Sequence, residues 1–418
     1  MADGAAGPTP SQASSRAAAS TPLTGVTVLD LTNVLAGPFA AYQLACLGAR
    51  VVKIESPEGD LARKLGADPV PAGSGMGISF LAVNAGKESL VIDLKQPAGK
   101  ALLLDLVDRA DVLLENFRPG VMDRLGIGPD VLRGRNPRLV YCAISGFGHD
   151  GPLASRPAYD QIIQGLSGVM SVTGDAASAP LRVGYPVCDT TGGLTAAFAI
   201  CAQLLHARAS GAGAFLDVSM LDATLAAMGW VVSNCLNAGV DPQPLGNDNF
   251  TAAPSGTFRT GDGLLNIAAN EQRQFEALAD IVGAPEWKHD ARFAERESRK
   301  RHRNVLNAAL ERALAPRSAV DWEQLLVDAG VPAGRVLTVP AILRHAHVAE
   351  AQLVATYADV PGVRQPVRVA RPGFRIDGSR PRAASPPPML SAQRDALLQE
   401  LGYDEARRAA LVASGAVR

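Results

Sequence analysis

The stretch VTVLDLTNVLAGPFAAYQLACLGARVVKIE, residues 26–55, joins two short apolar runs through a segment with the pattern of a helix. The runs at 26–31 and 50–55 are rich in β-branched residues and predict strands. Between them Pro38 stands near the start of the helical segment and Gly48 just past its end, which are the positions that helix boundaries favour. Because parallel strands need a long crossover connection, this unit predicts a parallel pair.

The same alternation of strand and helix continues along the chain. Further strands are predicted at 89–94, 112–115, 138–145 and 214–220, with helical segments between them. Short apolar strands that alternate with helices are typical of a doubly wound parallel sheet. The predicted fold class is therefore α/β, with a Rossmann-like large domain.

The pattern changes after a predicted long helix at 221–239. Residues 254–270 predict a hairpin, and helices are predicted around 272–282, 303–314 and 318–329, which together indicate a smaller α+β domain. The predicted division is a disordered tail at 1–21, a large α/β domain at 22–210, a connecting strand and helix at 211–239, and the small domain at 240–330. Residues 331–418 are predicted to form a linker that returns to the large domain. This last segment ends in a predicted helix at 391–401, which Ser391 would cap.

Composition narrows the class of protein. The chain has 418 residues, of which 47% are hydrophobic and 19% charged, as is typical of soluble globular enzymes. A net charge of −1 gives no electrostatic case for binding nucleic acid or an anionic membrane. The sequence shows no secretory signal and no apolar run of the ~20 residues that span a membrane. Five widely spaced cysteines without a CxxC pair predict reduced thiols and a cytoplasmic location.

One carboxylate stands out in VGYPVCDTTGG, residues 183–193. Asp189 follows an apolar run and precedes a helical pattern over 190–209, so we expect it to be buried at the N-cap of that helix. A buried carboxylate needs partners, since removing its water costs several kcal/mol. It is either a simple cap or a nucleophile beside an oxyanion site, with Gly192 and Gly193 admitting a substrate carbonyl to the backbone N–H groups.

Several familiar signatures are absent from the sequence. The first predicted strand is not followed by GxGxxG, which disfavours an ordinary dinucleotide site. The sequence also lacks a P-loop, a GxSxG nucleophile elbow and the HExxH spacing of zinc hydrolases. We therefore expect no metal.

Several segments nevertheless occur in a recognisable order. They are LTGVTVLDLTNVLAGPFAAYQLACLGARVVKIESP (23–57), NAGKESLVIDLKQPAGKALLLDLVDRADVLLENFRPGVMDRLGIG (84–128), NPRLVYCAISGFGHDGP (136–152), VCDTTGG (187–193) and GAFLDVSMLDA (213–223). Together they resemble the family III CoA-transferases (the CaiB/BaiF-like family), whose members include formyl-CoA and carnitine CoA-transferases. The resemblance extends from about residue 23 to the C-terminus and is dense through residue 222.

The resemblance implies roles for individual residues. Asp189 matches the nucleophile, and Val34 and Leu35 match positions that flank the adenine of CoA. The other implied CoA-binding residues are Ile92, Asp93, Leu94, Lys95, Asn116, Phe117, Arg118 and Arg124, with the backbone of Ser145, Gly146, Phe147 and Gly148 along the pantetheine. Lys95, Arg118 and Arg124 would supply cations for the phosphates of this ligand.

The resemblance also implies a reaction. CoA would pass from an acyl-CoA donor, with succinyl-CoA as a candidate, to a small carboxylic acid through an aspartyl anhydride and an aspartyl-CoA thioester, in enzyme class EC 2.8.3.-. Tyr159, Glu271 and Arg273 are the expected substrate contacts, and either Arg273 or Arg259 would reach a distal carboxylate. The family implies an interlocked homodimer in the cytoplasm, with CoA as substrate and no metal.

The sequence departs from the family pattern in places, and alternatives to CoA transfer have to be considered. Lys87-Glu88 replaces a Lys-Arg pair, Ser56 replaces an arginine of some members, and 268–275 (AANEQRQF) replaces a glycine-rich loop. The related α-methylacyl-CoA racemases carry a His-Asp step where this chain has Tyr159-Asp160, and a tyrosine with a pKa near ~10 is a poor base. CoA transfer is therefore preferred over racemisation or non-catalytic acyl-CoA binding.

Overall fold

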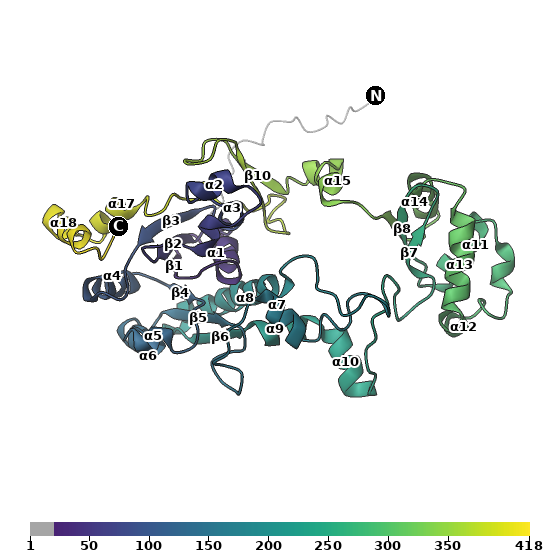
Figure 1. The fold of residues 1–418 in the computed structure, drawn as a ribbon, viewed down its shortest axis with the longest axis horizontal. Coiled ribbons are helices and arrows are strands. Elements are labelled where there is room, and N and C mark those ends of the chain that lie inside the picture. The colour runs from purple at the N-terminus through teal and green to yellow at the C-terminus, as the bar shows by residue number, and fades with distance from the viewer. Residues whose placement is uncertain (1–20) are drawn as a thin grey trace, which may run out of the picture. The chain divides into compact units, whose positions relative to one another are not determined.

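The computed structural model describes residues 21–418, so the predicted tail at 1–21 lies, apart from Thr21, outside the described residues. The chain divides into two compact units (Figure 1). The first comprises the chain up to Tyr159 together with Cys188–Ala223 and Gln352–Arg418, and the second comprises Asp160–Val187 and Thr224–Ala351. The first unit is thus built from three separate stretches of sequence.

A six-stranded sheet in the order β3-β2-β1-β4-β5-β6 forms the centre of the first unit (Figure 1). Its strands are β1 (Thr27–Asp30), β2 (Arg50–Glu55), β3 (Lys87–Val91), β4 (Val112–Glu115), β5 (Val140–Ser145) and β6 (Phe215–Ser219). Every neighbouring pair is parallel. This is the strand order of a doubly wound Rossmann-type sheet, whose direction of winding reverses between β1 and β4. The predicted parallel α/β fold is confirmed.

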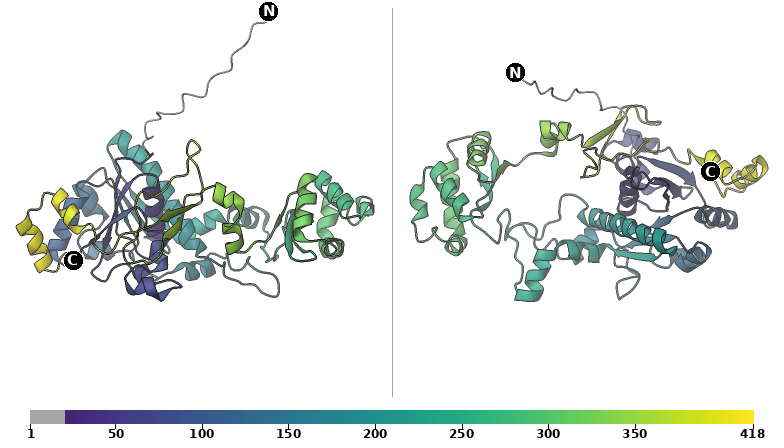
Figure 2. Two further views of the ribbon diagram at one scale, coloured as in Figure 1. Left: turned by 90° about the horizontal axis from the view of Figure 1, so that it is seen from above. Right: turned by 180° about the vertical axis from the view of Figure 1, so that it is seen from behind.

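Helices and a hairpin surround this sheet (Figure 2). They are α1 (Ala36–Cys46), η1 (Leu61–Lys64), α2 (Pro69–Gly73), α3 (Ile78–Leu81), α4 (Pro97–Val107), α5 (Val121–Arg124), α6 (Pro129–Arg135), α8 (Val187–Ser210), α17 (Arg394–Glu400), α18 (Glu405–Ala413) and the antiparallel pair β10 (Val354–Tyr357) and β11 (Val367–Ala370). The C-terminal helices pack on the sheet: Leu398 and Tyr403 share a buried apolar cluster with Leu102 and Leu113.

The second unit has its own apolar core around a three-stranded antiparallel sheet. Its strands are β7 (Ser255–Arg259), β8 (Leu264–Ala268) and β9 (Ala333–Arg335), and its helices are α7 (Asp160–Leu166), α10 (Gly229–Ala238), α11 (Gln272–Ile281), η2 (Pro285–Lys288), α12 (Arg296–Arg301), α13 (Arg303–Leu314), α14 (Ala319–Asp328), α15 (Val339–Leu343) and α16 (Ala346–Glu350). Helix α9 (Met220–Ala227) begins in the first unit and ends in the second.

Three predicted elements differ from the structure. The helix expected at 221–239 is two helices, α9 and α10, which part at Met228, directly before Gly229. Ser391 has φ of 58° and is not the cap of α17, whose N-cap is Gln393. The strand expected at 89–94 lies earlier in the chain, since β3 begins two residues before the expected start, at Lys87, and ends three residues before the expected end, at Val91.

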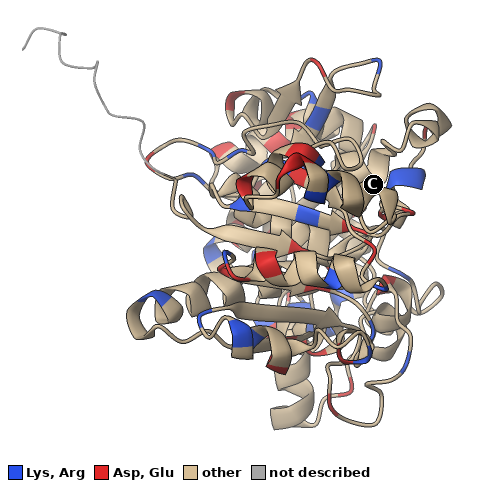
Figure 3. Ribbon diagram, turned by 90° about the vertical axis from the view of Figure 1, so that its left-hand side faces the viewer, with Lys and Arg blue, Asp and Glu red and all other residues tan. Residues whose placement is uncertain are grey.

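Acidic and basic residues are interspersed over the elements that face the viewer in Figure 3, which agrees with the net charge of −1. Within residues 21–418, no helix combines the length and the apolar character needed to cross a membrane. In the same part of the chain, no group of three or more His, Cys, Asp or Glu side chains has an arrangement that could hold a metal ion.

Candidate active site

A pocket of about 440 Å³ lies in the first unit, at the carboxyl ends of β1, β4 and β5. In doubly wound sheets, ligands bind outside the carboxyl ends of the strands where the winding reverses, which here is between β1 and β4. The pocket is lined by Asn33, Val34, Leu35, Ala36, Leu61, Asn116, Phe117, Arg118, Pro119, Ile144, Ser145, Gly146, Ala154, Arg156, Pro157, Ala158, Tyr159, Asp189 and Met220.

Asp189 reaches this pocket from the first turn of α8. The helix begins at Val187, so Asp189 is its third residue and not its N-cap, and the side chain is half-buried and not fully buried as expected. Its place in the first turn still favours the charged carboxylate, because the helix N-terminus carries partial positive charge. A half-buried carboxylate that lines a pocket is accessible to a ligand.

The two glycines after Asp189 have a packing role that differs from the predicted one. Both are buried, and a Cβ at Gly193 would lie 2.5 Å from the Ala36 carbonyl oxygen. A Cβ at Gly192 would lie 3.1 Å from Met220 Cγ. They therefore allow α8 to approach α1 and Met220 closely, and the expectation that they admit a substrate carbonyl to backbone N–H groups stays a prediction.

The turn between β1 and α1 has an unusual backbone. Val34 has φ of 70°, in the left-handed region that a β-branched residue enters at a cost of about 1–2 kcal/mol. Its N–H donates to Asp60 Oδ1 at 3.0 Å, and Leu61 N donates to Asn33 Oδ1 at 2.9 Å. The turn that carries two predicted adenine contacts, Val34 and Leu35, is thus restrained by the segment that follows β2.

A second restraint joins this turn to the loop after β4. Asn33 N donates to Asn116 Oδ1 at 2.8 Å, and Asn116 Nδ2 donates to the Asn33 carbonyl at 2.9 Å. The Asn116 amide, predicted to bind CoA, therefore lies in the pocket wall with its oxygen and nitrogen both engaged by the backbone of Asn33. Beyond it, Phe117 and Arg118 line the same pocket.

The predicted residues fall into two groups. The pocket brings together Val34, Leu35, Asn116, Phe117, Arg118, Ser145, Gly146, Tyr159 and Asp189, whereas Ile92, Asp93, Leu94, Lys95, Arg124, Phe147 and Gly148 are not among the residues that line it. Lys95 and Arg124 are exposed, whereas Ile92 is buried in the core beneath the sheet edge. Gly148 N donates to Ser145 Oγ at 2.9 Å, so it supports the loop whose first residues reach the pocket.

Glu271 and Arg273 belong to the second unit. Both side chains are exposed, and they pair with each other, Arg273 Nε to Glu271 Oε2 at 2.7 Å. Glu271 is also the N-cap of α11, where it forms a capping box with Gln274. In this chain the pair thus has a local structural role at the start of a helix.

Sequence reasoning missed several pocket residues. Arg156 and the neighbouring Ala154, Pro157 and Ala158 come from a loop without helix or strand, and periodicity gives no signal there. Arg156 adds a second guanidinium group to the lining of the pocket that Arg118 also lines, which suits a ligand with several anionic groups. The sequence SRPAY before Asp160 marks a loop, and only its place in the fold brings it to the pocket.

A buried network of charges lies next to the pocket turn. Lys87 Nζ lies 2.8 Å from Asp30 Oδ2, and Lys53 Nζ lies 2.9 Å from Asp60 Oδ2; all four side chains are at most 1% exposed. Burial by itself raises the pKa of Asp30, but Lys87 and Lys53 outweigh burial and lower this pKa to about 2. Asp30 therefore stays ionised, and the network is composed of charged groups.

Glu115, the last residue of β4, is a buried carboxyl two residues before Phe117. Burial raises its pKa to about 7, although the Phe117 N–H, His149 and Tyr141 act in the opposite direction. The Phe117 N–H donates to Glu115 Oε2 at 2.7 Å. The protonation of Glu115 therefore changes at neutral pH directly beneath a residue that lines the pocket.

This geometry predicts a pH effect on stability. Between pH 4.5 and about 7 the folded chain holds a proton on Glu115 that the unfolded chain releases, so the stability contributed by this group falls as pH rises. Glu115→Gln keeps a side-chain oxygen that accepts from the Phe117 N–H. Between pH 5 and pH 8 the free energy of unfolding should fall less in this variant than in the wild type, and the two decreases should differ by up to about 3 kcal/mol. Urea unfolding at both pH values measures this difference, and parallel pH profiles for the two proteins would contradict the prediction.

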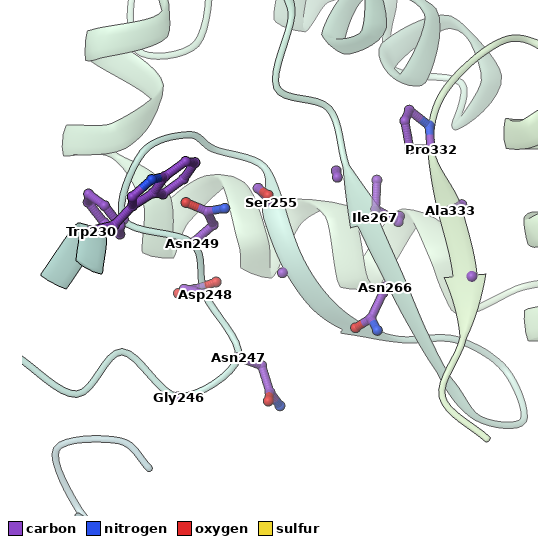
Figure 4. Close-up of a pocket in the computed structure, with 14 residues that line it drawn as sticks. Trp230, Gly246, Asn247, Asp248, Asn249, Ser255, Asn266, Ile267, Pro332 and Ala333 are labelled. Carbon is purple, nitrogen blue, oxygen red and sulfur yellow. The ribbon is translucent and has the colours of Figure 1, made fainter. Parts of the chain in front are cut away.

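A separate pocket of about 640 Å³ lies in the second unit (Figure 4). Trp230 and Asn249 line it from one side, and Asn266 and Ile267 of β8 line it from another. Within the described residues, its lining contains no lysine or arginine. It offers no cation for a phosphate, and the chemistry of the pocket at Asp189 is therefore the stronger candidate.

A Rossmann-type sheet with a carboxylate and two guanidinium groups at its switch point defines an α/β protein suited to a nucleotide-containing anion. The chain belongs to CoA-transferase family III, whose family model matches residues 23–394, and this confirms the resemblance seen in the sequence. It is 39% identical to the acetyl-CoA:oxalate CoA-transferase of Acetobacter aceti, and the alignment covers 92% of this chain and 97% of that one. It is 35% identical to the succinate–glutarate CoA-transferase of Agrobacterium fabrum, and this alignment covers 86% of this chain and 92% of that one. A crystal structure of a CaiB/BaiF family protein from Brucella suis is similar to this chain with a TM-score of 0.81 at 34% identity, covering 91% of this chain and all of that one.

Proposed function

We propose that this protein moves CoA from an acyl-CoA donor to a carboxylic acid, with Asp189 as the nucleophile. The observation that carries the proposal is the half-buried carboxylate of Asp189 in a pocket with Arg118 and Arg156. The guanidinium groups suit the phosphates of CoA, and the loop at Ser145–Gly146 suits its pantetheine arm. Asp189 is then within the same pocket as a bound thioester.

The first half-reaction loads CoA onto the enzyme. The Asp189 carboxylate attacks the thioester carbonyl, the C–S bond breaks, and CoA leaves as a thiolate, which gives a mixed anhydride. The thiolate then attacks the aspartyl carbonyl of the anhydride. The C–O bond to the donor acid breaks, and the donor leaves as a carboxylate from an aspartyl-CoA thioester.

The second half-reaction repeats these steps in reverse with the acceptor. The acceptor carboxylate attacks the aspartyl-CoA carbonyl and displaces the thiolate, and the thiolate then attacks the acceptor carbonyl of the new anhydride. The product acyl-CoA forms as the Asp189 carboxylate is released. No proton is gained or lost overall, so the site needs no general acid, but both intermediates must be kept from water.

Tyr159 supports transfer over the racemase alternative. Its side chain is 69% exposed and lines the pocket, at the place where a racemase would have a histidine. A phenol lacks the imidazole nitrogen with which a racemase histidine would remove a proton from carbon. Short dicarboxylates are the proposed acids, with succinyl-CoA as the first donor to test, because relatives are named for succinate, glutarate and oxalate.

The experiment is a panel of acyl-CoA donors and free dicarboxylic acids, with products identified by mass spectrometry. Transfer with at least one pair is expected, and a 2-methylacyl-CoA incubated in D₂O should gain no deuterium at C2, because the chemistry touches only the carbonyl. A racemase must exchange this proton even without an acceptor acid. Rapid deuterium uptake with no transfer to any acid would overturn the proposal.

We further propose a cytoplasmic homodimer with interlocked chains. Helix α8 presents a stripe of exposed apolar side chains, Leu194 (50% exposed), Phe198 (76%) and Leu205 (73%), and exposed apolar patches of this kind mark protein interfaces. Their spacing of four and seven residues places them on one side of the helix. Cys46, Cys142, Cys201 and Cys235 are free thiols, which agrees with a reducing compartment.

A further inference from the structure

The strained turn at Val34 and the buried carboxylate of Asp60 meet at one hydrogen bond. The Val34 N–H donates to Asp60 Oδ1 at 3.0 Å. A valine with φ of 70° is an outlier, and such residues persist only where the surrounding structure holds them. The contact with Asp60 is therefore a direct restraint on a turn that forms one wall of the pocket.

Asp60 is itself held by Lys53, on the neighbouring strand β2. Lys53 Nζ lies 2.9 Å from Asp60 Oδ2 and donates to the Thr32 carbonyl at 2.8 Å. One buried ammonium thus binds both the carboxylate that holds Val34 and the backbone two residues before Val34. Burial of Asp30, Lys53 and Asp60 together makes these electrostatic contacts stronger than the same contacts in water.

The two oxygens of Asp60 have different partners, and only a carboxylate satisfies both. Oδ1 accepts from Val34 N and from Ala62 N, the latter at 2.8 Å, while Oδ2 faces the ammonium of Lys53. An asparagine would turn its NH₂ group either toward the ammonium or toward the two backbone N–H groups. Each orientation sets donors against donors, so the amide cannot reproduce the restraint.

We propose that Asp60 is a positioning residue for acyl-CoA: supported by Lys53, it keeps the Val34 turn in its left-handed conformation and so fixes the pocket wall that receives the nucleotide part of CoA. This inference rests on the proposed function of the pocket. It assigns Asp60 no contact with the ligand, in agreement with its place behind the turn; among the described residues that line the pocket, its neighbour Leu61 appears and Asp60 does not.

The test compares two aspartates with the same local role. Asp60 accepts from Ala62 N, and Asp68 accepts from Val70 N at 2.9 Å, each two residues ahead at a helix start, but Asp68 lies outside the pocket wall. Asp60→Asn should raise KM for acyl-CoA about tenfold and change kcat by less than about threefold, whereas Asp68→Asn should change neither by more than about twofold. A merely structural role would lower the active fraction, and with it kcat, at unchanged KM.

Relief of the strain at position 34 provides a second readout. Glycine adopts positive φ without cost, so Val34→Gly removes the need for a restraint. In the Val34→Gly background, Asp60→Asn should raise KM only about two- to threefold, a coupling that a double-mutant cycle measures. A tenfold effect in both backgrounds, or a folded Asp60→Asn protein with wild-type KM, would overturn the inference.

Two further arms keep every outcome informative. If Asp60→Asn does not fold, a comparison of Val34→Gly with Val34→Ala tests the inference instead. Strain in the left-handed region predicts a higher Tm and tighter CoA binding for the glycine variant than for the alanine variant. The opposite order would refute the inference. If the wild type transfers no CoA to any acid, the proposed function fails by itself. Calorimetric binding of free CoA to wild type and Asp60→Asn then tests the inference without turnover.

Discussion

Asp189→Asn should lower the rate of CoA transfer by at least about 10³-fold, because the amide cannot form the anhydride or the thioester. The substitution keeps the size of the side chain in the first turn of α8. We expect the free energy of unfolding to change by no more than about 1 kcal/mol, the range for a charge at a helix N-terminus. Steady-state transfer assays and calorimetric CoA binding measure the two effects separately.

Asp222 is a matched control for this experiment. It is the third residue of α9, as Asp189 is of α8, and among the described residues it does not line the pocket. Asp222→Asn should therefore keep transfer activity. Hydroxylamine added during turnover should modify the peptide that contains Asp189, and modification of another peptide, or transfer by Asp189→Asn at more than a trace of the wild-type rate, would reassign the nucleophile.

Asp30→Asn should have the largest effect on stability, a loss of about 3–5 kcal/mol, because it leaves the buried ammonium of Lys87 without its counter-charge. The two groups lie 2.8 Å apart and both side chains are fully buried. The substitution retains an oxygen for the Thr32 N–H, which donates to Asp30 Oδ1 at 3.0 Å, so the loss reports mainly on charge. Urea unfolding monitored by circular dichroism measures it.

An exposed ion pair supplies the comparison. Arg50 and Glu400 lie 2.6 Å apart with side chains 38% and 50% exposed, and Glu400→Gln should cost less than about 1 kcal/mol. Combining Asp30→Asn with Lys87→Met should restore part of the loss, since the unpaired buried charge is then gone. Equal losses of unfolding free energy for Asp30→Asn and Glu400→Gln would show that burial does not determine how much each ion pair stabilises the fold.

The parallel sheet could be predicted because each strand carries its own signal. The apolar runs at 50–55 and 112–115 coincide with β2 and β4, and the helical segment between the first two strands coincides closely with α1. Fully buried strands of a parallel sheet read as continuous apolar runs, which local sequence reveals. The proposed nucleophile, Asp189, could be predicted from the order of motifs and not from periodicity.

The buried charges could not be predicted, since a lysine in a strand reads as a solvent-facing residue. Lys53 and Lys87 are at most 2% exposed, and their partners Asp30 and Asp60 come from other strands or loops. Arg299 is similar: it occurs in a basic run but is 1% exposed and packs over the ring of Phe275. Pairing between residues distant in sequence decides such burial, and one sequence alone does not contain that information.

Gly193 sets a spacing that substitution of side chains cannot adjust. Because a Cβ there would lie 2.5 Å from the Ala36 carbonyl oxygen, the helix that carries Asp189 packs backbone to backbone on the start of α1. The loop at 154–159 differs, since it lines the same pocket with the side chains of Arg156 and Tyr159. Libraries confined to 154–159 would therefore vary this wall of the proposed acyl-CoA pocket, while the backbone contact at Gly193 keeps Asp189 in place against α1.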